Sequence, residues 1–273
     1  MKQRIISGTL CVIVLVAVLC FYKTLVLEAA ICVLSAVAVY ELLCADGFLE
    51  HKPFLFLSIA AAALMPYASR FNLQGAVIAI FLVGVVVLLL RFHSKISFEK
   101  ISFLVVSTLG VSLSFLSILL LRNEYRTTGL IYILIIFGGA WFADTGAYFT
   151  GRFFGKHKLS PQISPKKTVE GAIGGIITNI LLVDLMAFVY TKIAANFDIA
   201  ATVNYIELSV LAALVAFAGM AGDLIASVIK RQIGIKDYGN VIPGHGGIMD
   251  RFDSILFTAP TVYLVTRVFT VII

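Results

Sequence analysis

Acidic, hydroxyl and basic side chains recur at helical spacing at the end of an apolar stretch that begins near residue 206. Asp223, Ser227, Lys230 and Arg231 fall at i, i+4, i+7 and i+8, so they share one face of a helix. A carboxylate within the apolar part and two cations at its end are the groups that bind a metal ion and phosphate. The spacing therefore predicts a polar stripe that could serve phosphoryl chemistry.

The residues that follow this stripe continue the same chemistry. A Gly-rich turn, Pro243-Gly-His-Gly-Gly247, permits close backbone approach to a phosphate. Magnesium is bound by one or two carboxylates plus phosphate oxygens, and Lys and Arg neutralise phosphate charge. Each residue taken alone also has a structural interpretation. His245 could be a solvated or capping residue, and Asp253 could be a charge at the start of a helix that pairs with Arg251. The charged residues of this second part are Lys236, Asp237, His245, Asp250, Arg251 and Asp253.

A second polar stripe occurs earlier, where Asp144, Tyr148 and Arg152 are spaced i, i+4 and i+8 on one predicted helix. Asp144 follows a long apolar run, and a carboxylate at such depth is costly unless it pairs, binds a cation or faces water. Two interpretations remain open. Asp144 either makes a structural contact with Arg or Tyr, or it binds or supports a cation.

A third segment, Ser164-Pro-Lys-Lys-Thr168, precedes another apolar run. Ser164 is a candidate N-cap and Pro165 a candidate first helical residue, which places Lys166 and Lys167 in the first helical turn. Two cations there oppose the helix dipole unless an anion binds among them. The alternative is that both lysines only set membrane topology.

These residues are embedded in a chain of 273 residues that is 60% hydrophobic and only 13% charged. Soluble domains carry about 25% charged residues, so a bilayer is the solvent that fits this composition. The sequence predicts an all-α, polytopic integral membrane protein of about nine transmembrane helices, each near 20 apolar residues long. The predicted spans are 5–22, 25–44, 53–69, 74–91, 101–121, 129–150, 168–194, 206–231 and 251–272.

Orientation follows from the basic residues. Most of the 21 Lys and Arg residues lie on the side that holds the N-terminus, which predicts a cytoplasmic N-terminus and a site that opens to the cytoplasm.

Residues 1–125 are predicted to form scaffold helices, and residues 126–273 to carry the catalytic site within one membrane domain. The four cysteines all lie in the first two spans without a C-x-x-C pair and fit small apolar packing residues.

Three segments resemble the family of phosphatidate cytidylyltransferases, also called CDP-diacylglycerol synthases. The resemblance covers the contiguous run from Ser227 to Asp253, with Lys230-Arg231, Lys236-Asp237 and the Pro-x-His-Gly-Gly turn within it. The segments Asp144–Arg152 and Ser164–Gly171 are also similar to that family. The N-terminal half agrees only in its hydropathy.

The resemblance implies transfer of a cytidylyl group from CTP to phosphatidate, which gives CDP-diacylglycerol and pyrophosphate. It implies Mg²⁺, with a second, monovalent cation compatible with the same site. We expect Asp223 and Asp250 to bind the metal, with Asp144 as a further ligand or support. We expect Lys230 and His245 to take part in catalysis. The expected substrate-binding residues are Lys166, Lys167, Thr168, Ser227, Arg231, Lys236, Arg251 and Asp253.

Two other functions fit parts of the same pattern. Intramembrane charges and Gly-interrupted helices also occur in secondary transporters, although the chain shows no internal repeat. A related nucleotidyltransferase could act on another lipid phosphate.

The expected partners are CTP, phosphatidate and membrane lipid, with no nucleic acid, and the apolar spans are compatible with a homodimer. The expected location is the cell inner (cytoplasmic) membrane.

Overall fold

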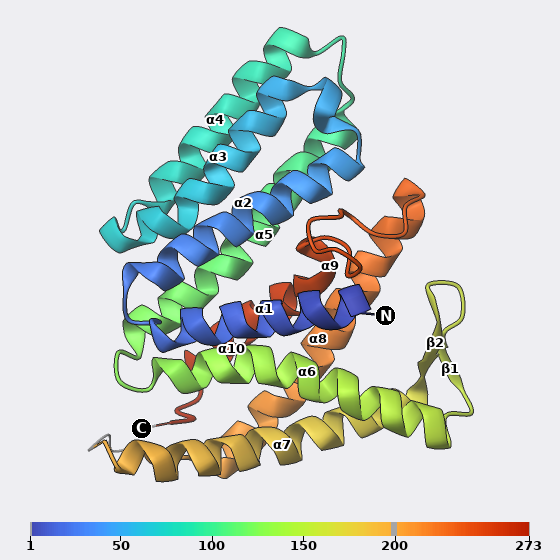
Figure 1. Cartoon of the computed structure of the whole chain (residues 1–273). Helices are drawn as coiled ribbons and strands as arrows, with labels where there is room; N and C mark the ends of the chain where they lie inside the picture. Colours follow the sequence, from blue (N-terminus) through green and yellow to red (C-terminus); the bar gives the residue numbers. More distant parts are fainter. Residues whose placement is uncertain (1, 198–200, 273) are drawn as a thin grey trace. The chain divides into compact units, whose positions relative to one another are not determined.

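The computed structural model describes residues 2–197 and 201–272, and most of these residues are helical (Figure 1). Eight of the nine predicted spans coincide with a single helix to within a few residues at each end. The helices are α1 (Lys2–Cys20), α2 (Leu25–Ala45), α3 (Lys52–Ala68), α4 (Gln74–Phe92), α5 (Phe98–Glu124), α6 (Gly129–Phe154), α7 (Val169–Ala195), α8 (Tyr205–Ile233), α9 (Met249–Phe252) and α10 (Ile255–Thr266), with short 3-10 turns at Phe48–Glu50 and Ser69–Phe71.

Seven of the described helices, α2 to α8, are long and apolar enough to cross a membrane. The chain is therefore a multi-pass membrane protein of the all-α class. Two shorter apolar helices, Ile6–Cys20 and Ile255–Thr266, correspond to the first and last predicted spans. The count of nine spans and the cytoplasmic N-terminus stay predictions.

The last predicted span, 251–272, is shorter as a helix than the sequence indicated. It is divided into α9 and α10, and α10 ends at Thr266 after 12 residues. Backbone pairing explains the end of the helix: Asn204 N–H donates to Val271 O at 3.0 Å, and Val203 and Ile272 form an antiparallel bridge. After Thr266, Arg267 and Val268 form a turn, and Val271 and Ile272 take part in the backbone pairing rather than in a helix.

The chain divides into two compact units. The first comprises residues Met1–Leu119 and Gln232–Phe252, and the second comprises Leu120–Arg231 and Asp253–Ile273. The functional division between a scaffold at 1–125 and a catalytic part at 126–273 stays a prediction. The loop with the Gly-rich turn nevertheless belongs to the same unit as the N-terminal helices.

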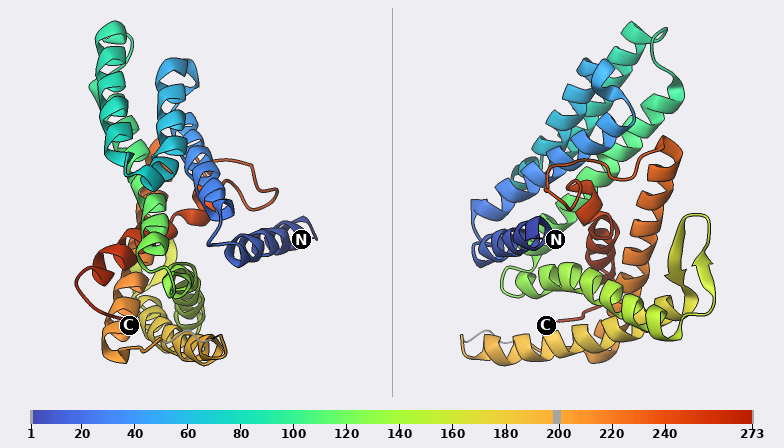
Figure 2. Two further views of the ribbon diagram at one scale, coloured as in Figure 1. Left: turned by 90° about the vertical axis from the view of Figure 1, so that its left-hand side faces the viewer. Right: turned by 45° about the vertical axis from the view of Figure 1, so that its right-hand side comes forward.

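In the first unit, α2, α3 and α4 are neighbouring helices joined by tight turns (Figure 2). The turn after α2 uses Gly47 with a φ of 84°, and the turn before α4 uses Asn72 with a φ of 56°. Glycine and asparagine are the residues that adopt this left-handed conformation most readily. Small side chains such as Ala38 and Ala62, both 0% exposed, bring the helices together.

In the second unit, α6 and α7 run side by side along most of their length (Figure 1). Glycines make this close approach possible, because a Cβ on Gly175 would lie 2.7 Å from the Ala143 carbonyl oxygen. Small residues at helix interfaces are the usual means of close packing in a membrane. The buried amide of Asn179 then donates to Ala212 O at 2.7 Å and ties α7 to α8.

The start of α7 differs from the prediction. Ser164–Thr168 is not the beginning of a helix but strand β2, which pairs antiparallel with β1 (Lys158–Ser160). An extended Ser164 before Pro165 is compatible with either a helix N-cap or a strand, and the pairing with β1 decides for the strand. The N-cap is Thr168, whose hydroxyl accepts from Gly171 N–H at 3.1 Å. Lys166 and Lys167 therefore lie on a hairpin. The prediction that they lie in the first turn of a helix was wrong.

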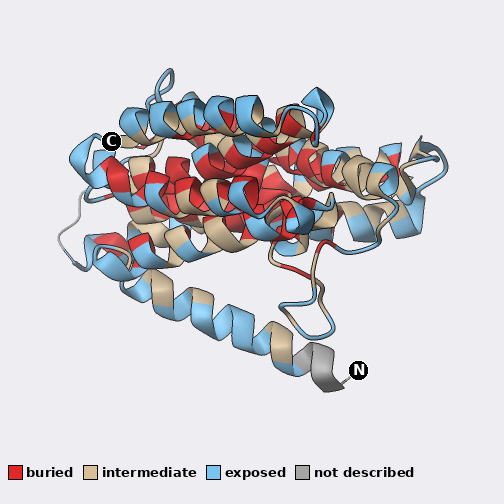
Figure 3. Cartoon of the chain, turned by 90° about the horizontal axis from the view of Figure 1, so that it is seen from above, coloured by how far each residue is buried: buried red, intermediate tan, exposed pale blue. Residues whose placement is uncertain are grey.

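The exposed surface is strongly apolar, as expected for helices in lipid. Within an apolar stretch of 18 residues, only 11% of α4 and 22% of α7 is buried inside the protein. Helix α1 has no buried residue over positions 6–20 and is drawn mostly as exposed in Figure 3. Such faces are compatible with a bilayer as their solvent.

We predict that Gly175→Ala destabilises the protein, because the added methyl group must displace the Ala143 carbonyl of α6. Overpacking of this kind costs about 1–3 kcal/mol. Thermal unfolding in detergent measures the loss as a lower Tm. Gly110→Ala in α5 is the matched control, since nothing lies within 4 Å of its Cβ position. An equal Tm for the two variants would contradict the packing argument.

Candidate active site

The Asp144 stripe lies on one face of α6, as predicted. Arg152 Nη1 donates to the Tyr148 hydroxyl at 3.0 Å, so these two side chains meet on that face. Asp144 instead interacts electrostatically with Asp223 of α8 and Lys167 of β2. Asp144 is also exposed at the surface. Asp144 is thus influenced by charged groups from other elements, and whether it binds or supports a cation stays a prediction.

Three carboxylates of the second unit interact with one another. Asp223 acts on both Asp144 and Asp253, and Asp144 also acts on Asp253. Gly222 explains how α8 approaches the chain at Asp253: a Cβ on Gly222 would lie 2.6 Å from the Asp253 carbonyl oxygen. The glycine next to Asp223 therefore places two acidic residues from distant parts of the sequence close together.

Two lysines accompany these carboxylates. Lys167 Nζ lies 2.5 Å from Asp223 Oδ2, with 24% and 32% of the two side chains exposed. Lys230 of α8 interacts with Asp253. Like charges at short range repel strongly where water is scarce, and the cations offset only part of this repulsion. These five residues, Asp144, Asp223 and Asp253 with Lys167 and Lys230, form a group that we call the acidic cluster.

A divalent cation fits the chemistry of this cluster. Carboxylate oxygens are hard ligands that suit Mg²⁺, and Mg²⁺ is commonly held by one or two carboxylates plus substrate phosphates. Within the described residues, no group of three or more His, Cys, Asp and Glu side chains is arranged to hold a metal ion by itself. Which of these carboxylates would bind a metal ion therefore stays a prediction.

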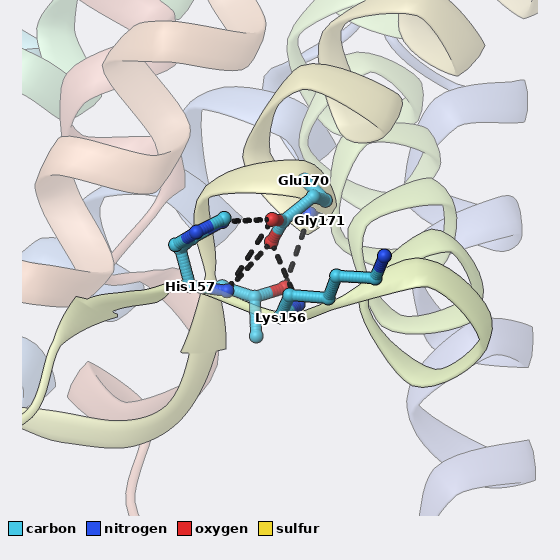
Figure 4. Close-up of polar contacts among 5 residues, drawn as sticks. Lys156, His157, Glu170 and Gly171 are labelled. Atoms are coloured by element: carbon cyan, nitrogen blue, oxygen red, sulfur yellow. Dashed lines mark hydrogen bonds and ion pairs between the residues drawn. The ribbon is translucent and has the colours of Figure 1, made fainter.

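The hairpin that carries Lys167 is fixed at its base by Glu170 in the first turn of α7 (Figure 4). Glu170 Oε2 accepts from the backbone N–H of Lys156 at 3.1 Å and of His157 at 3.2 Å. The His157 ring nitrogen Nδ1 lies 2.6 Å from Glu170 Oε1. One carboxylate therefore holds both the chain that enters the hairpin and an imidazole, at the end of the hairpin where Thr168 caps α7.

The Gly-rich turn of the first unit has the geometry that its sequence predicted. His245 N–H donates to Ile242 O and Ile242 N–H donates to Gly246 O, each at 2.9 Å. Gly244 and Gly246 have φ values of 79° and 85°. These are left-handed conformations, in which side chains with a Cβ are strained. The two glycines therefore fold the turn around His245.

His245 is held by the first helix. The Ser7 hydroxyl donates to Pro243 O at 2.9 Å and lies 2.8 Å from His245 Nδ1. Which of the two groups donates in the contact between Ser7 and Nδ1 depends on the tautomer of the ring. Arg251 Nε donates to His245 O at 2.9 Å, which closes the turn from the other side.

Asp250 organises the same loop. Its Oδ2 accepts from Tyr238 N–H at 2.8 Å and from Gly247 N–H at 3.1 Å. Asp250 belongs to the first unit, whereas Asp144 and Asp223 belong to the second, so the predicted set of metal ligands draws on both units. The structure thus gives Asp250 a role in loop geometry, and its role as a ligand stays a prediction.

The other predicted substrate residues differ in exposure. Thr168 is buried and caps α7, and Ser227 is half-buried on α8. The exposed cations of the set are Lys166, Arg231, Lys236 and Arg251. Their assigned roles in substrate binding stay predictions.

Sequence reasoning missed Glu41. The sequence predicted no role for it, but it is only 2% exposed and accepts from Met249 N–H at 2.8 Å. The available signal was the rarity of acidic residues inside apolar spans, which marks them as candidates for function. The partner segment, more than 200 positions away, could not be identified from that signal.

Comparison with known proteins identifies a family over nearly the whole chain. The model of the cytidylyltransferase family matches residues 2–269. A Bacillus subtilis (strain 168) protein named phosphatidate cytidylyltransferase is 33% identical over 281 residues, which cover 99% of this chain and 99% of the relative. The match includes the N-terminal helices, which by sequence inspection agreed only in hydropathy.

Two staphylococcal proteins with the same name are also similar. That of Staphylococcus aureus (strain COL) is 34% identical over 267 residues, or 95% of this chain and 96% of the relative. That of Staphylococcus saprophyticus is 42% identical over 167 residues, or 61% of this chain and 59% of the relative. The similarity is therefore both extended and, over part of the chain, high.

We predict that Glu170→Gln loosens the hairpin, because the neutral side chain loses the charge that supports its contacts with Lys156 and His157. Tryptic cleavage within residues 156–168, followed by mass spectrometry, should be several-fold faster in the variant. Glu99→Gln is the matched control, since Glu99 is an exposed glutamate in the first turn of α5. Equal cleavage rates in the wild type and both variants would show that Glu170 does not hold the hairpin.

Proposed function

The chain belongs to the cytidylyltransferase family, and on this premise we propose that it transfers a cytidylyl group from CTP to phosphatidate. The products are CDP-diacylglycerol, a precursor in phospholipid synthesis, and pyrophosphate. The names of relatives that match 95% or more of the chain support this activity. The structural observation that carries it is the acidic cluster with its two lysines, which lies among apolar helices, where a lipid phosphate and a nucleotide can meet.

The proposed reaction is a displacement at phosphorus. An oxygen of the phosphatidate phosphate forms a bond to the α-phosphorus of CTP, while the bond from that phosphorus to the bridging oxygen of pyrophosphate breaks. The phosphatidate phosphate is already anionic, so no strong base is needed. The barrier comes mainly from bringing two polyanions together, and positioning and charge neutralisation lower it.

We assign the handling of charge to the acidic cluster. Asp223 would hold Mg²⁺, with Asp144 as a further ligand or support, and the ion would supply positive charge to phosphate oxygens. Asp253 is proposed to contact substrate. The grouping of these carboxylates with Lys167 and Lys230 supports this assignment. Lys167 is paired with Asp223 in the structure, so a substrate phosphate competes with Asp223 for the Lys167 ammonium group. Lys230 would then bind a phosphate of CTP or the departing pyrophosphate.

We assign supporting roles to the Gly-rich loop. His245 would bind a phosphate oxygen or donate a proton late in the reaction. Asp250 is proposed as a further metal ligand, and Arg231, Lys236 and Arg251 as phosphate-binding cations. The proposal also includes an inner-membrane location, a cytoplasmic opening, a homodimer and an additional monovalent cation.

Pyrophosphate release by the purified protein in detergent tests the proposal. The assay contains CTP, dioleoyl phosphatidate and Mg²⁺, and each component is omitted in turn. We expect release only with all three, together with CDP-diacylglycerol detected by mass spectrometry. Activity with a different lipid phosphate alone would indicate a related nucleotidyltransferase. Uptake of substrate into liposomes without a covalent product would indicate a transporter and reject the proposal.

We predict that Asp223→Asn lowers turnover to background in a protein that still folds, because the amide removes a negative charge from the acidic cluster. Asp184→Asn is the matched control: Asp184 lies in α7 and its carboxylate accepts from the Ser209 hydroxyl at 2.8 Å. Initial rates of pyrophosphate release measure both variants, with Tm as the check on folding. Activity retained by Asp223→Asn would remove the proposed metal role.

We predict that Lys167→Ala lowers kcat/KM by about 100-fold, the magnitude typical of removing one group that stabilises developing charge. Lys158→Ala is the control, because Lys158 is an exposed lysine on the other strand of the same hairpin. Kinetics with varied CTP and varied phosphatidate provide the comparison. If both variants lose activity equally, the pairing of Lys167 with Asp223 has no particular importance.

A further inference from the structure

A buried glutamate of the first unit has a place in the structure that the proposed reaction does not explain. Glu41 lies near the end of α2 and is 2% exposed. Its Oε2 accepts from Met249 N–H at 2.8 Å, and its Oε1 has no hydrogen-bond partner among the described residues. A carboxylate in such surroundings is costly. Its retention therefore points to a specific task.

Two glycines of the Gly-rich loop enclose this carboxylate. A Cβ on Gly239 would collide with Glu41 Oε1, and a Cβ on Gly247 would collide with Glu41 Oε2. Backbone without side chains therefore packs directly on both oxygens. The loop wraps Glu41 at two points that are eight positions apart in the sequence.

Asp250 holds the same loop at neighbouring positions. Asp250 accepts from Tyr238 N–H, next to Gly239, and from Gly247 N–H. Glu41 packs against Gly239 and Gly247 and bonds to Met249, the residue before Asp250. Two acidic side chains, Glu41 of α2 and Asp250 of α9, thus contact the same two stretches of the loop, near Gly239 and near Gly247.

An apolar residue of similar size could fill the space at position 41, but it could not accept the hydrogen bond from Met249 N–H. An ionised carboxylate differs from an amide in that both oxygens only accept hydrogen bonds. That property suits a group surrounded by loop backbone whose N–H groups must be held in place.

We propose that Glu41 is a positioning residue that holds the segment from Tyr238 to Asp250 in its active geometry. Glu41 acts through Met249 and the two glycines and does not touch substrate. Its effect on turnover rests on the proposed function of the loop, whereas its effect on loop order does not. The N-terminal helices are then more than a scaffold, because α2 supplies a residue that shapes the loop.

Hydrogen–deuterium exchange of the full-length protein in detergent tests loop order. Glu41→Gln and Glu41→Leu should speed amide exchange in residues 238–250 by at least about tenfold, because the charge-assisted bond to Met249 N–H is weakened or lost. Glu50→Gln is the control, since Glu50 is exposed and lies close after α2 in the sequence. Glu41→Gln, which keeps one acceptor oxygen, should change less than Glu41→Leu.

Kinetics on the same samples test the link to catalysis. We expect kcat to fall by about 10- to 100-fold, the range typical of residues that orient a metal-binding or reacting group. The KM values for CTP and phosphatidate should change less than about threefold, because Glu41 contacts neither. Gly239→Ala reaches the same carboxylate without altering α2, and Gly110→Ala is its control.

The outcomes separate the two proposals. Unchanged exchange in residues 238–250 of folded Glu41 variants overturns the positioning role, whatever the activity. Faster exchange with undiminished kcat also overturns it, and shows in addition that the loop and Asp250 do not serve the reaction. If both Glu41 variants fail to fold, Gly239→Ala decides: unchanged exchange and kcat would overturn the proposal, and faster exchange with a lower kcat would support it.

Discussion

Like charges held together among apolar helices are the constraint on which the second unit depends. Asp144, Asp223 and Asp253 interact within one cluster, and Lys167 and Lys230 offset only part of their charge. Such a cluster is stable only if the backbone keeps the groups in place. The glycines between α6 and α7, and Gly222 beside Asp253, provide that rigidity through close helix packing. A site of this kind suits the binding of a cation together with a phosphate.

The loops around the two units are fixed by the same physical means. In each case a carboxylate accepts backbone N–H groups: Glu170 at the base of the hairpin, and Asp250 and Glu41 in the Gly-rich loop. Hydrogen bonds to a charged acceptor are stronger than neutral ones, and more so where water is scarce. A membrane protein with few polar residues thus uses several of its acidic side chains to shape irregular backbone.

Membership of the cytidylyltransferase family agrees with this chemistry. A reaction between a lipid phosphate and a nucleoside triphosphate needs charge neutralisation and alignment more than it needs a strong base. The residues that the structure brings together are suited to that task. The match of relatives along the N-terminal helices is consistent with a fold in which α1 contacts His245 through Ser7 and α2 contacts the loop through Glu41.

The sequence alone determined the membrane class, eight of the helical segments, the Gly-rich turn and the stripes on α6 and α8, because hydropathy and helical spacing are local properties. It did not determine that Ser164–Thr168 is a strand, since Ser-Pro fits both a helix start and extended chain, and only pairing with Lys158–Ser160 decides. The short α10 likewise depends on pairing with Val203. The partners of Lys167, Asp253 and Glu41 lie far away in the sequence, so contacts between distant segments, which only the tertiary structure provides, decided which charges meet.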